Sequence, residues 1–495
     1  MIPVVDIFAG PGGLGEGFSA WRDVRNRQRF RLAISLEKDA HAHATLRLRA
    51  LRRLLGDSVP HEYDLLLRGK RDWESLDGRL AAERRKAEAE AIRLELGAST
   101  VGDVRSLVRA KVSSDEPWVL VGGPPCQAYS LVGRARNKGN PHYSAALDHR
   151  QTLYVEYLQI LADHVPPVFV MENVKGLLSA KLHRLRMFDR IREDLADPAK
   201  ALKRENRTSS TRGPRYEICP LVPPLDLLGD DPKGYVVRSE LFGVPQRRHR
   251  VILLGIRSDI AHGPLKQLLP TWPASTVDAT ICSLPRLRSG LSKEPDSDIE
   301  WTDRLQSFRN EKWVRSLPLP VKRKIERTLR DLRPPAMSRG SDYLQLRSGA
   351  VVLNHSTRGH MACDLKRYLF ASSFASVFGN SPALSDFPEE LLPNHANIQR
   401  ALGDGMFADR FRVQVATEPA TTVTSHIAKD GHYYIHPEPA QCRSLTVREA
   451  ARLQTFPEDY FFCGPRTAQY QQVGNAVPPM LAQQVAGVVA DLLGV

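Results

Sequence analysis

The chain opens with a short apolar run, Ile2–Phe8, that ends in the glycine-rich loop Ala9–Gly13. Directly after this loop, the pattern through Phe18 and Trp21 is typical of the start of a helix. Apolar runs that end at glycine and proline in this way indicate a strand, a tight loop and a helix in succession. We therefore expect an α/β fold built on a largely parallel sheet.

Later parts of the chain repeat this pattern of apolar runs that end at turn residues. Four further apolar runs have the length of buried strands and are bounded by turn residues: Leu32–Leu36, Trp118–Val121, Val168–Met171 and Val251–Ile256. Near the C-terminus, Leu445–Phe456 has helical spacing after a Ser444 or Thr446 cap, and Met480–Leu493 is a final apolar helix.

The length of 495 residues favours two domains, because single cores stop growing well below this size. From about Ser258 to Gln441 the strand and helix alternation disappears and prolines cluster, which indicates a second module with irregular loops. Two charged stretches, 47–96 and 181–215, interrupt the first part, and we expect both to be insertions on its surface.

Composition narrows the class of partner and the compartment. A formal net charge of +14 suits a polyanionic partner such as nucleic acid. The six cysteines form no C-x-x-C pair and His41 and His43 have no partner cluster, so we predict neither a metal site nor a disulfide framework. An apolar run of the ~20 residues that span a membrane is missing, and the glycine loop comes too early for a signal peptide. We expect a soluble, cytoplasmic protein.

The first chemical motif is the loop itself. Gly10–Gly15 fits G-x-G-x-x-G between a strand and a helix, and Glu37 ends the next predicted strand. Glycines let the backbone approach a ligand closely, and a carboxylate can accept both hydrogen bonds of a ribose diol. The motif indicates an adenosine-containing cofactor; the alternative is a tight turn without a ligand.

The second chemical motif, Gly122–Gln127, directly follows the predicted strand 118–121 and places Cys126 on a turn behind two prolines. A lone cysteine is more often a buried structural residue. However, an acid and arginines lie next to two other predicted strands, in Met171–Val174 and Gln246–Arg250. Taken singly, Glu172 could cap a helix, and the arginines could simply lie on a solvent-exposed surface. Together, a thiol, an acid and arginines at neighbouring strand ends can converge on one cleft.

In this order, the motifs resemble those of prokaryotic DNA cytosine-5 methyltransferases over nearly the whole chain. Asp6–Gly13 resembles the cofactor loop, Gly122–Gln127 the nucleophile motif and Glu172–Val174 the acid motif. Gln246–Arg250 resembles the arginine motif, and Arg443–Arg452 and Gln472–Val477 the last two motifs of the family.

The resemblance implies a Rossmann-like S-adenosylmethionine-dependent methyltransferase domain with a smaller irregular target-recognition domain. The boundaries become 1–257 for the catalytic domain, 258–465 for the target-recognition domain, and 466–495 for a segment that returns to the catalytic domain. Lys38 replaces an apolar residue of the family, and the span between Glu37 and Asp103 is long.

Residue by residue, the resemblance implies that Phe8 stacks on the adenine of S-adenosylmethionine, Glu37 holds its ribose, and Asp103 meets the adenine amino group. Asn475 closes the same pocket. The remaining cofactor-binding positions that it implies are Gly10, Gly12, Gly13, Pro124 and Val477.

The implied reaction is addition of the Cys126 thiolate to C6 of a cytosine flipped out of duplex DNA. Glu172 acts at N3 of the base, and Arg250 and Arg248 bind O2 or orient Glu172. The loop 128–149 is a candidate lid over the DNA. Asn354–His360 and Thr421–His426 are expected either to contact base edges or to pack the second module.

Double-stranded DNA is therefore the expected substrate, and a companion restriction endonuclease or phage-defence proteins are family-level expectations. Three alternatives stay open at this point. An RNA cytosine-5 methyltransferase would share the nucleophile and acid motifs, and a catalytically silent DNA-binding regulator would share the basic surface. A nicotinamide dehydrogenase would explain Gly10–Gly15 but not Pro124–Gln127.

Overall fold

The computed structural model describes residues 1–113, 116–125, 149–182, 185–209, 213–223, 232–260, 262–270, 274–335, 338–394 and 409–495. The chain packs into two compact units. The first unit comprises Met1–Gly243, Arg248–Trp272 and Ala476–Val495, and the second comprises Val244–Arg247 and Pro273–Asn475.

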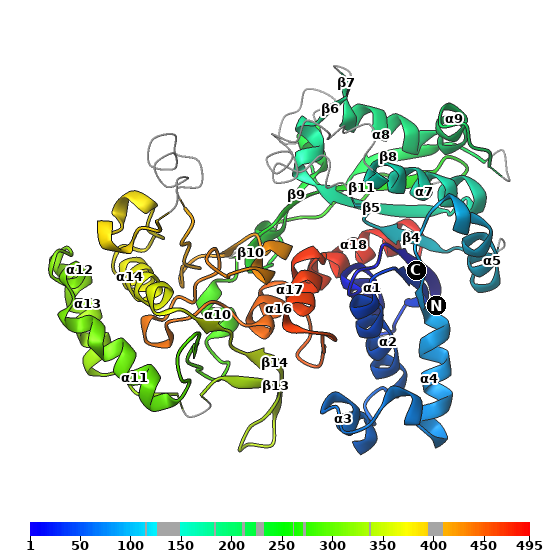
Figure 1. The fold of residues 1–495 in the computed structure, drawn as a ribbon. Helices are drawn as coiled ribbons and strands as arrows, with labels where there is room; N and C mark the ends of the chain where they lie inside the picture. The colour runs from blue at the N-terminus through cyan, green and yellow to red at the C-terminus, as the bar shows by residue number, and fades with distance from the viewer. Residues whose placement is uncertain are drawn as a thin grey trace. The chain divides into compact units, whose positions relative to one another are not determined.

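The first unit is built on a sheet with the strand order β3-β2-β1-β4-β5-β11-β8, in which β9 also pairs with β11 (Figure 1). The strands β3, β2, β1, β4 and β5 are parallel, and β11 runs antiparallel to β5, β8 and β9. The strand bounds are Ile2–Ile7 (β1), Phe30–Glu37 (β2), Ala91–Arg93 (β3), Val119–Gly122 (β4), Val168–Val174 (β5), Tyr216–Pro220 (β8), Val236–Arg238 (β9) and His249–Arg257 (β11). The predicted Rossmann-like, mostly parallel α/β fold is confirmed.

Helices cover both faces of this sheet, because alternate residues of a strand point to opposite faces. Val5 and Ile7 of β1 belong to a core shared with α5, α7, α8 and α9, whereas the Asp6 face lies against α1. The helix bounds are Gly13–Ala20 (α1), Ala40–Leu55 (α2), His61–Leu67 (α3), Gly78–Glu90 (α4), Val101–Lys111 (α5), His149–His164 (α7), Met187–Ala196 (α8), Pro198–Arg204 (α9) and Pro479–Leu492 (α18). Helices α1 and α18 pack closely, since a Cβ on Gly17 would lie 2.4 Å from the Cβ of Ala482.

The stretches 47–96 and 181–215 were predicted to be insertions on the surface. This prediction was wrong, because both contribute secondary structure to the first unit. In the stretch 181–215, Phe188, Ile191 and Leu195 of α8 are buried in the main core of the unit. In the stretch 47–96, β3 pairs with Ser35–Glu37 and forms an edge of the sheet. Both stretches therefore contribute elements that the first unit needs, although their polar faces remain exposed.

The second unit has a helical core and several two-stranded sheets. Its core contains the fully buried Trp301, Val321, Ile325 and Leu369. The principal helices are Val277–Ile281 (α10), Asp298–Ser307 (α11), Lys312–Arg315 (α12), Leu319–Arg330 (α13), Ala362–Phe378 (α14), Val447–Leu453 (α16) and Arg466–Asn475 (α17). The short strands pair as β10–β16 (Gln246–Arg247, Ala420–Thr421), β12–β15 (Gly290–Leu291, Gly359–His360) and β13–β14 (Gly340–Gln345, Val351–Ser356).

The units divide at somewhat different residues from the predicted domains. Residues 466–475 belong to the second unit, because a Cβ on Gly474 of α17 would lie 2.3 Å from the backbone nitrogen of Ser425. Residues 258–272 belong to the first unit, where the amide of Ser258 donates to the carbonyl of Arg215 and that of Leu268 to Leu221. Among the described helices, none is long and apolar enough to cross a membrane.

Candidate active site at the carboxyl ends of the parallel strands

The chain leaves β1 toward β2 and β3 on one side and later returns to β4 and β5 on the other. The strand order therefore reverses between β1 and β4, and a crevice opens at the carboxyl ends of strands at such a point. Two of the sequence motifs follow these strand ends, namely the glycine loop after Ile7 and the segment Gly123–Pro125 after Gly122. Ile7 and Gly122 are paired residues of the two strands.

The glycine loop after β1 takes a left-handed backbone, which glycine adopts without strain. The φ angles are 56° at Gly10 and 95° at Gly12, and Phe8 also has a positive φ of 54°. No described atom lies within 4 Å of where a Cβ of Gly10 would be, whereas a Cβ on Gly13 would lie 2.1 Å from the carbonyl oxygen of Val477. The loop is thus tight on the side of Val477 and open at Gly10.

Glu37, at the end of β2, is joined to this loop. One of its carboxylate oxygens accepts a hydrogen bond from the amide of Gly10 at 2.8 Å, and the other accepts one from the amide of Asp39 at 2.8 Å. Burial raises the pKa of Glu37 above its ordinary value. Each carboxylate oxygen keeps a second lone pair for a ligand hydroxyl.

These features fit S-adenosylmethionine as the cofactor. The backbone at Gly10 is open enough to lie against a ligand, and Glu37 beside it can accept hydrogen bonds from a ribose. The half-buried ring of Phe8, at the edge of the core, offers a surface on which an adenine can stack. Beneath the loop, Asp6 is buried, with one oxygen accepting from the amide of Gly15 at 3.2 Å. Burial raises the pKa of Asp6 to about 8.

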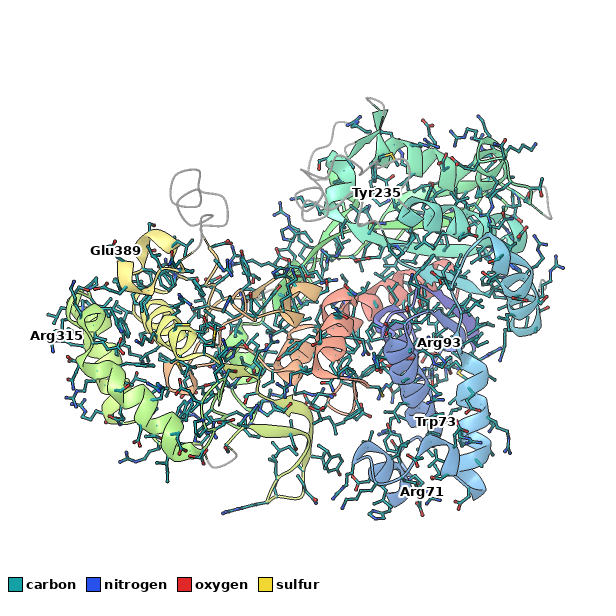
Figure 2. The ribbon with its side chains drawn as sticks, viewed as in Figure 1. Arg71, Trp73, Arg93, Tyr235, Arg315 and Glu389 are labelled. Carbon is teal, nitrogen blue, oxygen red and sulfur yellow. The ribbon has the colours of Figure 1, made fainter. Side chains whose placement is uncertain are left out.

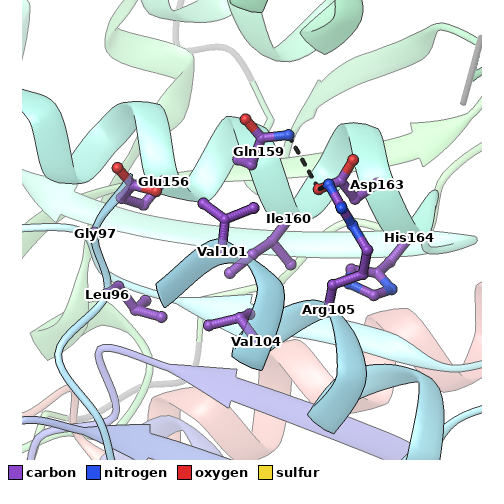
Figure 3. Close-up of a pocket in the computed structure, with 10 residues that line it drawn as sticks. All are labelled: Leu96, Gly97, Val101, Val104, Arg105, Glu156, Gln159, Ile160, Asp163 and His164. Carbon is purple, nitrogen blue, oxygen red and sulfur yellow. Dashed lines mark hydrogen bonds and ion pairs between the residues drawn. The ribbon is translucent and has the colours of Figure 1, made fainter. Parts of the chain in front are cut away.

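Asp103 lies on the first turn of α5, where it is exposed. Its helix contacts β2, the strand that ends in Glu37. A small hollow lies beside the same helix, between α5 and α7 (Figure 3), but none of the glycine loop lines it. Its polar groups already have partners, since Asp163 accepts from Arg105 at 2.8 Å and from Gln159 at 3.0 Å. We assign no chemistry to this hollow.

The segment that leads to the predicted nucleophile is held by the end of β5. The side-chain amide of Asn173 donates to the carbonyl oxygen of Pro124 at 3.3 Å, and a Cβ on Gly123 would lie 3.1 Å from a carboxylate oxygen of Glu172. Cys126 and residues 128–148 of the predicted lid, 128–149, lie outside the described residues. The role of Asn173 was missed from the sequence, because its partner is 49 positions away.

Glu172 and Arg250 form an ion pair of 2.9 Å between the carboxylate and the guanidinium Nε. Their strands β5 and β11 are antiparallel neighbours, with Glu172 opposite Ile252 and Arg250 opposite Val174. The two side chains are therefore diagonal neighbours on one face of the sheet. Burial lowers the pKa of Arg250, and the Glu172 carboxylate opposes that shift.

The predicted arginine motif is divided between the two units. Arg248 belongs to the first unit, is only 2% exposed, and its amide donates to the hydroxyl of Ser239 at 3.0 Å. Gln246 belongs to the second unit, where it contacts Gln454 at 3.0 Å and the amide of Val423 at 2.6 Å. A further pair missed from the sequence, His249 with Glu240 at 2.8 Å, adjoins Arg250.

The last predicted cofactor residues also fall in different units. Val477 belongs to the first unit and lies against Gly13, as described above, whereas Asn475 is the last residue of the second unit. Among the described residues, no group of three or more His, Cys, Asp or Glu side chains could hold a metal ion.

The two segments proposed either to contact bases or to pack the second unit include several buried side chains. His355 bonds the hydroxyl of Thr446 at 2.9 Å and the carbonyl of Pro285 at 2.8 Å, and Asn354 donates to the carbonyl of Phe462 at 3.1 Å. These contacts favour the packing role for Asn354 and His355.

Comparison with known proteins identifies the family. The profile of C-5 cytosine-specific DNA methylases matches residues 76–198 and 225–490, well over half of the chain. The Type II methyltransferase M.Bpa9945I of Bacillus paralicheniformis is 31% identical, with 99% of each chain covered. The Type II methyltransferase M.AgeI of Thalassovita gelatinovora is 24% identical, with 97% of each covered.

A solved structure shows the same fold. It is of a prophage-encoded E. coli protein provisionally described as a DNA modification methyltransferase, with a TM-score of 0.52 and 17% identity over 100% of both chains. The chain belongs to the C-5 cytosine-specific DNA methylase family and is a DNA (cytosine-5-)-methyltransferase. The predicted family and enzyme class are confirmed.

Proposed function

We propose that the enzyme transfers a methyl group from S-adenosylmethionine to C5 of a cytosine rotated out of a specific duplex DNA sequence, through a covalent bond between Cys126 and C6. The observation that supports this most strongly is the Glu172 carboxylate, held by Arg250 at 2.9 Å beside the segment that leads to Cys126. Atoms of a stacked base are out of reach of such a site, so the target base has to leave the helix at a cost of a few kcal/mol.

C5 of cytosine is too weak a nucleophile to attack a methyl group by itself, so the enzyme has to activate the ring with a nucleophile of its own. The Cys126 thiolate adds to C6, and the electron pair of the C5–C6 bond shifts toward N3, where Glu172 hydrogen-bonds or donates a proton. C5 of the resulting enamine then takes the methyl group, as the methyl–sulfur bond breaks and S-adenosylhomocysteine is left as the second product. Loss of the C5 proton and cleavage of the C6–sulfur bond restore the aromatic ring and the thiolate.

Arg250 has two tasks in this scheme. It fixes the orientation of the Glu172 carboxylate, and its guanidinium, which stays charged, stabilises charge that develops on O2 of the base. The buried Arg248 supports the same region. The backbone amide of Arg248 donates to the hydroxyl of Ser239.

S-adenosylmethionine, when bound, supplies an electrophilic methyl group. Phe8 and Asp103 would hold its adenine and Glu37 its ribose. The positions that would line the rest of the pocket are Gly10, Gly12, Gly13, Pro124, Asn475 and Val477. The left-handed glycines allow the backbone to approach the ligand, and the Gly13 contact with Val477 fixes the shape of the loop.

We further propose a role in restriction–modification, in which methylation protects cellular DNA from a companion endonuclease. The two curated relatives reported above are both Type II methyltransferases, which supports this role. A target-recognition role for the second unit and a cytoplasmic location remain predictions.

The test is bisulfite sequencing of plasmid DNA from cells that express the wild type or Cys126→Ala. Protected cytosines within one short motif, lost in the variant, would support the proposal. Circular dichroism of the purified variant would check that it is folded. If the wild type released S-adenosylhomocysteine only with RNA, or if Cys126→Ala still methylated DNA, the proposal would be wrong.

A further inference from the structure

Helix α13 of the second unit, Leu319–Arg330, separates apolar and basic residues onto opposite sides. Val321, Ile325 and Leu329 are fully buried in the core of the unit, where the helix contacts α14 and α11. Arg323, Arg327 and Arg330 are exposed. Their spacing of four and three residues places them in one row, because such positions are neighbours on a helix surface. We call these three residues the arginine row.

Charge is strongly unbalanced along this helix. It carries five basic residues, Lys322, Arg323, Lys324, Arg327 and Arg330, against the single acid Glu326. Within the part of the chain that the structure describes, Arg323 and Arg327 form no ion pair, and Arg330 contacts only its neighbour Asp331, at 3.4 Å. The preceding segment adds the exposed Arg309 and Arg315 (Figure 2 labels Arg315), whereas its Lys312 pairs with Glu390 at 3.8 Å.

Helix stability does not explain this pattern. Cations near the C-terminus of a helix interact favourably with its dipole, which accounts for Arg327 and Arg330 in the last turn. Arg323 and Lys324 lie before that turn. Like charges four residues apart, as in Arg323 and Arg327, destabilise a helix. A face that served only solubility would interleave acids, as α4 of the first unit does.

We propose that the arginine row binds the phosphate backbone of duplex DNA without reading its sequence. At 1.5 Å per residue the row extends over roughly 10 Å of helix axis, and each DNA strand carries a phosphate about every 3.4 Å of its axis. Arginine donors pair with phosphate oxygens in a planar, two-pronged geometry. The inference adds a DNA contact to the proposed function of this enzyme and rests on that function only for the identity of its partner.

The experiment compares the wild type with Arg323→Gln/Arg327→Gln/Arg330→Gln on a duplex of random sequence about 40 base pairs long, by fluorescence anisotropy across a salt series. A control with the same change in charge is Lys70→Gln/Arg85→Gln/Lys86→Gln, three exposed residues of the first unit. Each phosphate contact contributes about 0.9 to the slope of log K against log salt concentration. The arginine-row variant should therefore lower the slope by about 2 to 3, and the control by less than 1.

The second arm uses a duplex that contains the methylated site. Loss of contacts to phosphates weakens binding uniformly across sequences, so the fold-loss should be the same with and without the site. An unchanged slope on random DNA would overturn the inference. An acidic protein surface would then be the alternative partner of the arginine row. A loss confined to the site-containing duplex would also overturn it, because the row would then read bases. Binding to random DNA is measurable even if methylation fails, so the two proposals can fail separately.

Discussion

The side chains of Glu172 and Arg250 meet at 2.9 Å on neighbouring antiparallel strands, and each is only 12–13% exposed. The pair is thus mostly removed from water, on the same side of the sheet as the segment before Cys126. An acid in such a pair keeps a fixed orientation, which a proton donor to the substrate requires.

Replacement of the acid tests its chemical role. Glu172→Gln keeps the size of the side chain and one hydrogen-bond acceptor but removes the carboxylate. We expect single-turnover methylation to fall about 10²- to 10⁴-fold, the usual contribution of general acid–base groups. DNA binding measured by anisotropy should change little. A near wild-type single-turnover rate would mean that another group acts at N3.

Removal of the arginine tests the structural role of the pair. Arg250→Met should leave the Glu172 carboxylate buried without its partner and lower the local stability by about 3 kcal/mol. Hydrogen exchange of peptides from β5 and β11 would measure the loss. The double variant Glu172→Gln/Arg250→Met should recover much of it, because no unpaired charge then remains. If the single and double variants exchanged alike, the pair would have no such role.

Asn173 offers a test of a positioning residue. Asn173→Asp keeps the oxygen that accepts from the amide of Val174 at 2.8 Å but loses the donor to the Pro124 carbonyl at 3.3 Å. We expect a fall in the methylation rate at saturating DNA and cofactor, together with faster proteolysis or exchange in the segment after Pro124. A merely structural role would lower stability and leave the rate per folded molecule unchanged.

Adding a single methyl group at Gly13 tests whether the glycine loop binds the cofactor. Gly13→Ala would bring a Cβ to 2.1 Å from the carbonyl oxygen of Val477, a clash that forces the backbone to move. We expect a loss of about 1–3 kcal/mol in stability and weaker binding of S-adenosylmethionine by calorimetry. Gly263→Ala is the matched control, because no described atom lies within 4 Å of its Cβ position. Equal effects of the two substitutions would contradict the assignment of this loop.

Much of the fold could be predicted because its strands are long, apolar and bounded by turn residues. The edge strand β3 was missed, since the helix-prone pattern from Leu80 continues through Ala91–Arg93 and only pairing with Ser35–Glu37 makes these residues a strand. Helix α8 was assigned to the surface because of its charge. Its Phe188, Ile191 and Leu195 nevertheless have the spacing of a buried helix face, so this signal was present in the sequence.

The site was predictable where a motif is contiguous. Glu172 and the glycine loop lie at strand ends as expected, because a parallel sheet collects the carboxyl ends of its strands at one edge. Pairings between distant segments, such as Asn173 with Pro124 or His249 with Glu240, depend on strand order and register. A single sequence does not contain that information in readable form.

The buried Asp6 predicts how stability depends on pH. Burial raises its pKa from 3.8 to about 8, so the folded protein holds a proton that the unfolded chain releases above pH 3.8. The stabilisation is therefore fully present below pH 3.8 and is lost as the pH rises toward 8, by up to about 1.4 kcal/mol per pH unit. Asp6→Asn removes this titration and can still accept from the amide of Gly15. We expect the unfolding free energy of the variant, relative to wild type, to rise between pH 4 and pH 8 in urea titrations. A difference that stays constant across this range would show that Asp6 keeps its ordinary pKa in the folded enzyme.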